Sequence, residues 1–156
     1  MLNPNNEVAF WQPVPANGHV TIKIQPKHIG GDVASMGTQT VGVGGYVREH
    51  AHPDQDEIIF VLEGEGVAII EDVRYDMKPG AAFFLPRNVR HSFVNRGDAE
   101  LTFTWTVMPG FGLPEFFEKI GRAKLDGEPA PAPFDRPMDV EAIEKAAGFS
   151  KVKQPA

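Results

Sequence analysis

The stretch from Gly44 to Gly64, GGYVREHAHPDQDEIIFVLEG, decides the fold and places His50 and His52 one residue apart. Alternate residues of an extended strand point to the same face, so the two imidazoles should aim at one point. The turn-like segment 53–56 should then reverse the chain, and Glu57 opens a second strand beside the first. Two imidazoles and a carboxylate that converge from paired strands suit a first-row divalent metal, of which non-haem Fe(II) is one candidate.

This stretch has the spacing G-x5-H-x-H-x4-E-x6-G, and residues 80–95 follow with G-x5-P-x-N-x2-H-x3-N. Together the two patterns resemble the two signatures of the cupin family, with Asn88 where the family pattern has glycine. The departure is mild, because asparagine tolerates left-handed backbone geometry well. The resemblance implies an all-β protein, a cupin barrel of the double-stranded β-helix or jelly-roll type. It also implies that four side chains hold a metal: His50, His52, Glu57 and His91.

The length of 156 residues predicts a single domain. Residues 1–37 are interpreted as an N-terminal arm with an edge strand, because residues 19–25 alternate between apolar and polar side chains. Residues 38–108 are expected to form the barrel, with short strands separated by turns.

Residues 109–156 are expected to form a C-terminal extension, with short helices on either side of a proline-rich coil. The extension resembles, more weakly than the barrel motifs do, tails of small bacterial cupins that include quercetin dioxygenase-like proteins. Two roles stay open for it. It packs on the barrel or on a second subunit, or it acts as a lid that covers the mouth with Phe111, Phe116 and Phe117.

Composition excludes several classes of protein. The chain has no cysteine, so disulfides and thiolate metal ligands are absent. A net charge of −6 without a basic stripe argues against a nucleic-acid partner. The N-terminus lacks the blocks of a signal peptide, and no apolar run reaches membrane-spanning length. We therefore expect a cytoplasmic protein with no membrane partner.

Strand parity counted back from His50 places Arg48 and Tyr46 on the same inward face, as candidates for the substrate pocket. The planar guanidinium of Arg48 is suited to anchoring a carboxylate or phenolate. A surface position for Arg48 is an equal alternative, because a bulge near Gly44 would change the parity. Aromatic residues at strand spacing are candidates for a pocket wall, with the core as the alternative: Phe84, Phe93, Phe103 and Trp105.

Three imidazoles and one carboxylate leave two positions of a six-coordinate metal open, which is typical of a catalytic site. The structural alternative is a tetrahedral zinc ion that the four side chains satisfy. The resemblance implies, as the first hypothesis, an Fe(II) dioxygenase that acts with O2 on a small enolic, phenolic or carboxylate substrate.

Two further hypotheses stay open. The second is a redox-neutral cupin isomerase, lyase or decarboxylase that uses Mn, Ni or Zn, with Glu49, Tyr46 or Tyr75 as the candidate acid or base. The third is a non-catalytic cupin that binds a small ligand such as a sugar. By analogy with cupins of this size we also expect a homodimer.

Overall fold

The computed structural model describes residues 7–150, so the start of the predicted arm and the last six residues lie outside the described part. The described residues form eleven strands and three helices. The strands are β1 (Val8–Trp11), β2 (His19–Ile24), β3 (Ser35–Val41), β4 (Tyr46–His50), β5 (Asp56–Glu63), β6 (Gly66–Ile70), β7 (Val73–Met77), β8 (Ala82–Leu85), β9 (His91–Asn95), β10 (Leu101–Met108) and β11 (Arg122–Lys124). The helices are α1 (Pro26–Ile29), α2 (Leu113–Ile120) and α3 (Val140–Ala146).

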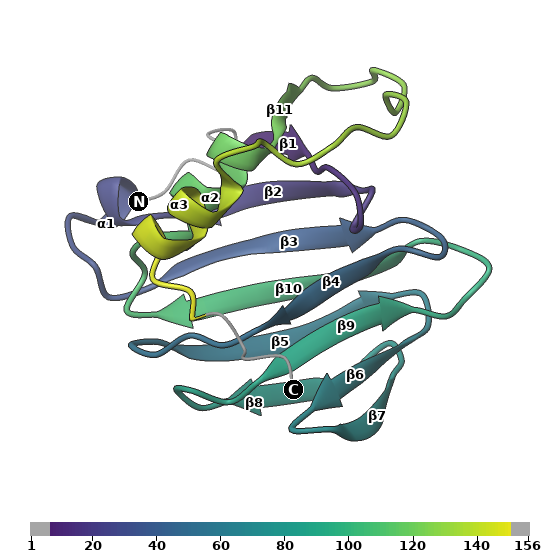
Figure 1. Cartoon of the computed structure of the whole chain (residues 1–156), viewed down its shortest axis with the longest axis horizontal. Coiled ribbons are helices and arrows are strands. Elements are labelled where there is room, and N and C mark those ends of the chain that lie inside the picture. Colours follow the sequence, from purple (N-terminus) through teal and green to yellow (C-terminus); the bar gives the residue numbers. More distant parts are fainter. Residues whose placement is uncertain (1–6, 151–156) are drawn as a thin grey trace.

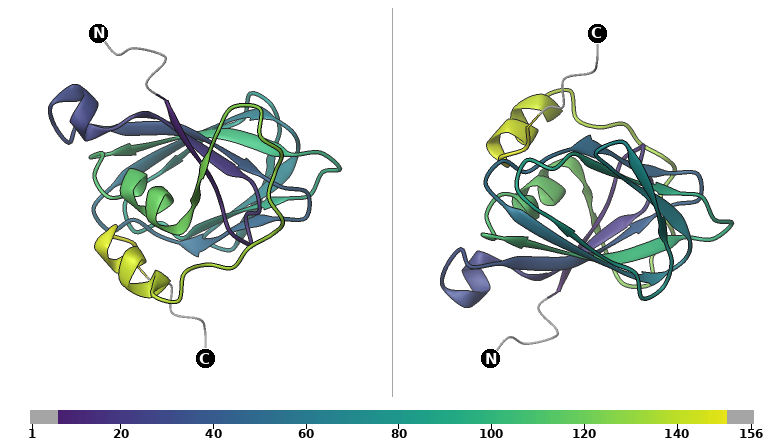
Figure 2. Two further views of the ribbon diagram at one scale, coloured as in Figure 1. Left: turned by 90° about the horizontal axis from the view of Figure 1, so that it is seen from above. Right: turned by 90° about the horizontal axis from the view of Figure 1, so that it is seen from below.

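The strands pair into two antiparallel sheets that face each other across one core (Figure 1). The larger sheet has the order β11-β1-β2-β3-β10-β5-β8, and the smaller has the order β4-β9-β6-β7. Between β3 and β10 the chain alternates between the two sheets at every step except from β6 to β7. This alternation closes the sheets into a barrel (Figure 2), and the predicted all-β jelly-roll with a short C-terminal helix is confirmed.

The core follows the two-residue period of the strands. In β10 every second side chain, from Leu101 to Val107, is buried, and the intervening threonines are half-buried. In β5 the residues that share a face with Glu57 are buried. The opposite face of β5 is apolar as well, yet Phe60 is 41% exposed there. The sheet has only one face toward the core, and this apolar stretch of β5 also presents side chains to the outside.

The first predicted strand is not at an edge. Strand β2 pairs with β1 on one side and with β3 on the other, and the edge position belongs to β11 from the C-terminal extension. The alternating pattern of residues 19–25 showed correctly that one face of the strand is buried. The pattern did not indicate which strands pair beside β2, because β1 and β11 are short segments from opposite ends of the chain.

Strands β3 and β4 are separated by a turn at residues 42–45. The turn contains Gly44 in the left-handed region, with φ of 73°. It carries the chain from the larger sheet to the smaller one. The turn therefore places β4, with the two histidines at its end, opposite β3 instead of in line with it.

Two further turns confirm the reading of the motifs. Asn88 has φ of 65°, so it adopts the left-handed conformation that glycine would occupy in the family pattern. Gly64 has φ of 81° in the turn between β5 and β6, and a Cβ atom there would collide with the carbonyl oxygen of Glu100. Both positions fix where the neighbouring strands begin, and Asn88 also donates its backbone N–H to the carbonyl of His52 at 3.0 Å.

The extension supplies the two helices that cover one end of the barrel (Figure 2). Helix α2 starts with Pro114 in its first turn and buries an apolar face that includes Phe116 and Phe117. Each aromatic side chain buried this way contributes about 1.5–3 kcal/mol to folding. Helix α3 contacts α2, and Asp139 occupies its N-cap position without making a side-chain capping hydrogen bond.

The longest helix within residues 7–150, α2, has eight residues. None of the described helices has the length and apolar character that crossing a membrane requires.

Candidate metal centre

The four predicted ligands come together at one point between the sheets. His50 ends β4 and His91 begins β9, and the two residues lie directly opposite each other in the β4–β9 ladder. His52 follows two residues after His50, and Glu57 is the second residue of β5. One ligand atom from each of the four side chains lies within 4.8 Å of all the others.

Two of the imidazoles are held in a defined orientation by the backbone. The Nδ1–H of His50 donates to the carbonyl of Arg48 at 2.8 Å, and the Nδ1–H of His91 donates to the carbonyl of Val89 at 2.9 Å. A carbonyl oxygen can only accept, so Nδ1 carries the hydrogen in both rings. The Nε2 lone pair is then left as the metal-binding atom, which is the usual arrangement for histidine ligands.

The cluster contains buried polar atoms without hydrogen-bond partners. These atoms are Nε2 of His91, both ring nitrogens of His52 and Oε2 of Glu57. The carboxylate oxygen lies 3.0 Å from Nε2 of His91 and 3.5 Å from Nε2 of His52, yet it forms no hydrogen bond. Buried polar groups are otherwise almost always paired. Nitrogen and oxygen donors that converge without partners fit a divalent metal ion.

The electrostatics of the cluster agree with this donor set. Burial by itself would raise the pKa of Glu57, but the neighbouring imidazoles of His52 and His91 outweigh it and lower the pKa of this carboxyl. Burial, together with the nearby His91 and His52, lowers the pKa of His50 well below its usual value. Glu57 is therefore ionised and His50 is neutral near pH 7, as metal ligands must be.

The pKa of His91 moves in the opposite direction. Burial of the ring would lower it, but the adjacent Glu57 carboxylate reverses the effect and the pKa of His91 is raised. Glu57 and His91 therefore stabilise each other's charged form.

A cavity of about 1090 Å³ opens beside the cluster, and His50, His52 and Glu57 line it. Its walls are aromatic on two sides. The barrel contributes three rings and the C-terminal extension contributes three more: Phe93, Phe103 and Trp105 from the strands, and Phe116, Phe117 and Phe149 from the extension. This arrangement suits a largely apolar substrate that reaches the metal-binding residues.

The aromatic residues predicted for the wall do not all reach it. Phe84 is 62% exposed and points away from the barrel interior, because its neighbours Phe83 and Leu85 hold the inward parity of β8. Phe111, a candidate for the lid rather than for the wall, is outside the cavity lining, and its carbonyl accepts a hydrogen bond of 2.7 Å from Gln55. Gln55 is buried and ties the loop between the ligands to the extension.

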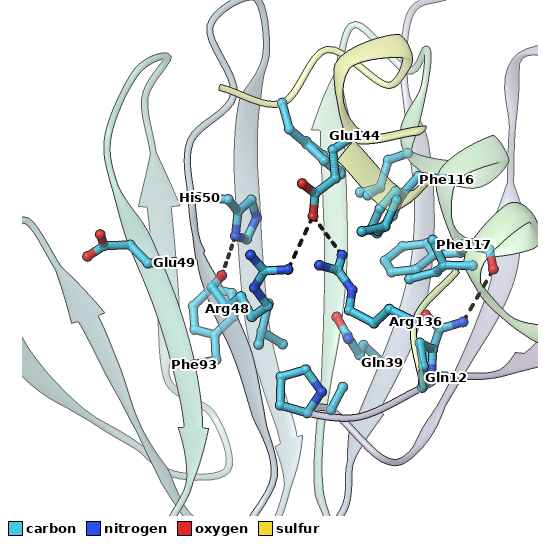
Figure 3. A pocket seen from close by; sticks show the side chains of 18 of the residues that line it. Gln12, Gln39, Arg48, Glu49, His50, Phe93, Phe116, Phe117, Arg136 and Glu144 are labelled. Atoms are coloured by element: carbon cyan, nitrogen blue, oxygen red, sulfur yellow. Dashed lines mark hydrogen bonds and ion pairs between the residues drawn. The ribbon is translucent and has the colours of Figure 1, made fainter. Parts of the chain in front are cut away.

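Both pocket candidates, Tyr46 and Arg48, line the cavity. The β4–β9 register does shift between Val47 and His50, yet Arg48 keeps its cavity position. The guanidinium of Arg48 is half-exposed and lies 3.7 Å from the carboxylate of Glu144 (Figure 3). Val47 and Glu49, which have the opposite parity, line the cavity as well, so a role of Tyr46 and Arg48 in substrate binding stays a prediction.

The other acid–base candidates are poorly placed. Glu49 borders the cavity, but its carboxylate points away from His50 (Figure 3) and lies 3.7 Å from Arg90. Tyr75 belongs to β7, where its ring packs 6.3 Å from that of Phe83, and it does not line the cavity.

Sequence reasoning missed three residues of the extension that lie at the site. The ring of Phe149 has its centroid 5.0 Å from that of His52 and 5.6 Å from that of His50. Arg136 and Glu144 line the cavity and form an ion pair of 2.6 Å. No periodicity pointed to them, because Arg136 lies in a proline-rich coil and the contacts span long distances in the chain. The only available signal was the pair of opposite charges eight residues apart.

Sequence comparison finds a family model, described as a cupin domain, that matches residues 37–107. Two proteins of Streptomyces are similar over most of their length. Protein SchB of Streptomyces halstedii is 28% identical over 113 residues, which cover 70% of this chain and 82% of SchB. The tetracenomycin polyketide synthase protein TcmJ of Streptomyces glaucescens is 26% identical over 123 residues, which cover 79% of this chain and 78% of TcmJ.

Among solved structures, the polyketide cyclase RemF from Streptomyces resistomycificus superposes with a TM-score of 0.59. The alignment covers 69% of this chain and 78% of RemF, at 22% sequence identity. At this identity the likeness establishes the shared fold.

Proposed function

We propose, from the premise that this chain is a small single-domain member of the cupin superfamily, that it is a metal-dependent enzyme of redox-neutral chemistry. The reaction that we propose is an aldol-type cyclisation of a polycarbonyl substrate. One observation carries the proposal. Four potential ligand atoms converge beside a large cavity that is lined by aromatic rings from both the barrel and the C-terminal extension.

The relatives support the redox-neutral alternative over the Fe(II) dioxygenase that the sequence motifs first suggested. TcmJ is named as a polyketide synthase protein, and the superposing RemF is named as a polyketide cyclase. Cyclisation of a polycarbonyl chain changes no oxidation state overall and needs no O2. This class of reaction also matches the size of the cavity, because a folded chain of several carbonyl groups is larger than a simple organic acid.

The four side chains that would hold the metal are His50, His52, Glu57 and His91. A divalent ion there would supply Lewis-acid catalysis by polarising a carbonyl oxygen. The protein contributes positioning. The aromatic walls hold the substrate in a folded conformation, which brings the nucleophilic carbon near the carbonyl carbon and keeps bulk water away.

The proposed step balances without a co-reactant. A carbon next to one carbonyl group loses a proton and forms a bond to the carbon of a second carbonyl group. The oxygen of that second carbonyl group takes up a proton and becomes a hydroxyl group. This hydroxyl group and a second proton from the nucleophilic carbon then leave together as one molecule of water. Tyr46, whose hydroxyl-bearing side chain borders the cavity, stays the candidate for proton transfer.

The test uses 1-phenylhexane-1,5-dione, which cyclises to 3-phenylcyclohex-2-enone with loss of water. Protein supplied with Zn²⁺ or Mn²⁺ should form this product equally fast in air and under strict anaerobiosis, and chelator treatment should abolish the activity. Turnover that stops without O2, with oxygen uptake in step with product, would instead support the dioxygenase hypothesis.

A further inference from the structure

Two arginines and one glutamate meet on the cavity wall. Arg136 Nη2 lies 2.6 Å from Oε1 of Glu144, and Arg48 Nη1 lies 3.7 Å from the same oxygen. The three residues come from different elements: Arg48 from β4, Glu144 from α3, and Arg136 from the coil that precedes α3. Figure 3 shows both guanidinium groups turned toward the single carboxylate.

The donors of this group exceed what Glu144 uses. Nη1 of Arg136 is buried and has no hydrogen-bond partner in the protein. Most of the Arg136 side chain is also shielded from water. A buried guanidinium nitrogen without a partner is costly, and the cost is recovered if a ligand supplies an acceptor. Arg48 is half-exposed and makes only the longer contact, so its guanidinium also retains free donor capacity.

The group lies next to the metal-binding residues. Arg48 and His50 are two positions apart on β4, which corresponds to roughly 7 Å along a strand. Both residues line the same cavity. A substrate can therefore contact the metal-binding residues with one end and the arginines with a second group. The two groups of the substrate would be separated by about the length of one aromatic ring.

We propose that Arg48 and Arg136 form the recognition site for a carboxylate of the substrate, and that Glu144 occupies this site until the substrate arrives. The inference rests on the proposed function and adds to it a substrate class, namely an aromatic or polycarbonyl acid. Guanidinium groups bind carboxylates through paired, charge-assisted hydrogen bonds, and Glu144 presents the same chemical group as the ligand.

The position of Glu144 gives this competition a structural consequence. Glu144 is carried by α3, and the chain continues directly to Phe149 above His50 and His52. A substrate carboxylate that replaces Glu144 releases one of the contacts that hold α3 over the cavity. Binding of the acid and opening of this cover are thereby linked.

The test measures equilibrium binding of 2-naphthoate and of its neutral isostere 2-naphthamide to the full-length protein. Replacing Glu144 with glutamine removes the competing charge and keeps the shape of the side chain. Glu144→Gln should tighten 2-naphthoate binding about tenfold and leave the affinity for 2-naphthamide unchanged. One charge-assisted hydrogen bond changes a dissociation constant by about a factor of ten. Arg136→Gln should weaken 2-naphthoate binding about tenfold.

Glu118→Gln is the matched control, because it makes the same change of charge at an exposed position of α2. It should leave both affinities unchanged. Arg136→Lys keeps the charge but loses the planar pair of donors, so it should give an intermediate affinity even if Arg136→Gln folds poorly.

An unchanged ratio of naphthoate to naphthamide affinity in Glu144→Gln would overturn the inference. So would equal tightening in Glu118→Gln, which would indicate a general charge effect. Binding is read without turnover, so failure here leaves the proposed cyclisation standing, and failure of the cyclisation assay leaves the carboxylate site standing.

Discussion

The two walls of the cavity are built in different ways. Three members of the metal-binding cluster lie on the paired strands β4, β5 and β9, and His52 lies in the short loop between β4 and β5. The arginine–glutamate group joins β4 to a coil and a short helix of the extension. The first wall is set by regular geometry, and the second depends on long-range contacts. Under the proposed function, the chemistry would reside on the first wall, which we call the rigid wall, and substrate choice on the second, which we call the adaptable wall.

The largest effect should follow from removing a ligand on the rigid wall. His52→Ala takes one donor from a cluster whose other members cannot move to replace it, so metal affinity should fall by about a hundredfold or more. Elemental analysis of the protein purified without chelators measures this directly. A full complement of metal in His52→Ala would show that His52 is not a metal ligand. It would contradict the assignment of metal binding to the rigid wall.

A second prediction concerns the turn that supports the ligands. Asn88 has a positive φ and binds the carbonyl of His52 through its N–H. Asn88→Ala should lower the free energy of unfolding by about 1–2 kcal/mol, because alanine is strained in the left-handed region. Urea denaturation measures the change, and Asn88→Gly, which tolerates this backbone, is the control. Equal destabilisation by both substitutions would show that the backbone conformation is not the cause.

His52 and Asn88 also show which features of the site could be predicted from the sequence. The i, i+2 spacing predicted that His50 and His52 point to one place, although only His50 lies on β4, and the second motif supplied His91 and the left-handed residue Asn88. Such information is local, because it depends on spacing within one or two strands. The fold class and the metal-binding cluster were therefore predictable.

The neighbours of β2 and the position of Arg136 were not predictable in this way. Both depend on where a short segment from the far end of the chain docks, and neither β11 nor the coil around Arg136 has a periodic pattern. The exposed outer face of β5 is a third case, because an apolar run by itself does not tell which of its two faces meets the core. The expected homodimer stays a prediction.

The third prediction tests the adaptable wall. Arg48→Ala should raise KM about tenfold for a carboxylated probe, 4-(5-oxohexanoyl)benzoate, since one charge-assisted contact is lost. The KM for the uncharged 1-phenylhexane-1,5-dione and the metal content should stay unchanged. If the two probes lose affinity alike, Arg48 contributes to general packing instead of carboxylate recognition.

The smallest effect should come from the cover of the cluster. Phe149 packs against the rings of His50 and His52 but donates no ligand atom. Phe149→Ala should leave the metal stoichiometry intact and should speed removal of the metal by a chelator severalfold, because water reaches the cluster more easily. Stopped-flow absorbance with a coloured chelator follows the rate. A loss of stoichiometry would mean that the extension belongs to the rigid wall after all.

The central claim is that His50, His52, Glu57 and His91 together hold one metal ion, and anomalous diffraction from crystals of the metal-loaded protein tests it most directly. We predict a single anomalous peak that lies about 2.0–2.2 Å from three histidine nitrogens and one glutamate oxygen. A peak elsewhere in the molecule, or a fully loaded protein whose four side chains lie away from the peak, would contradict the account.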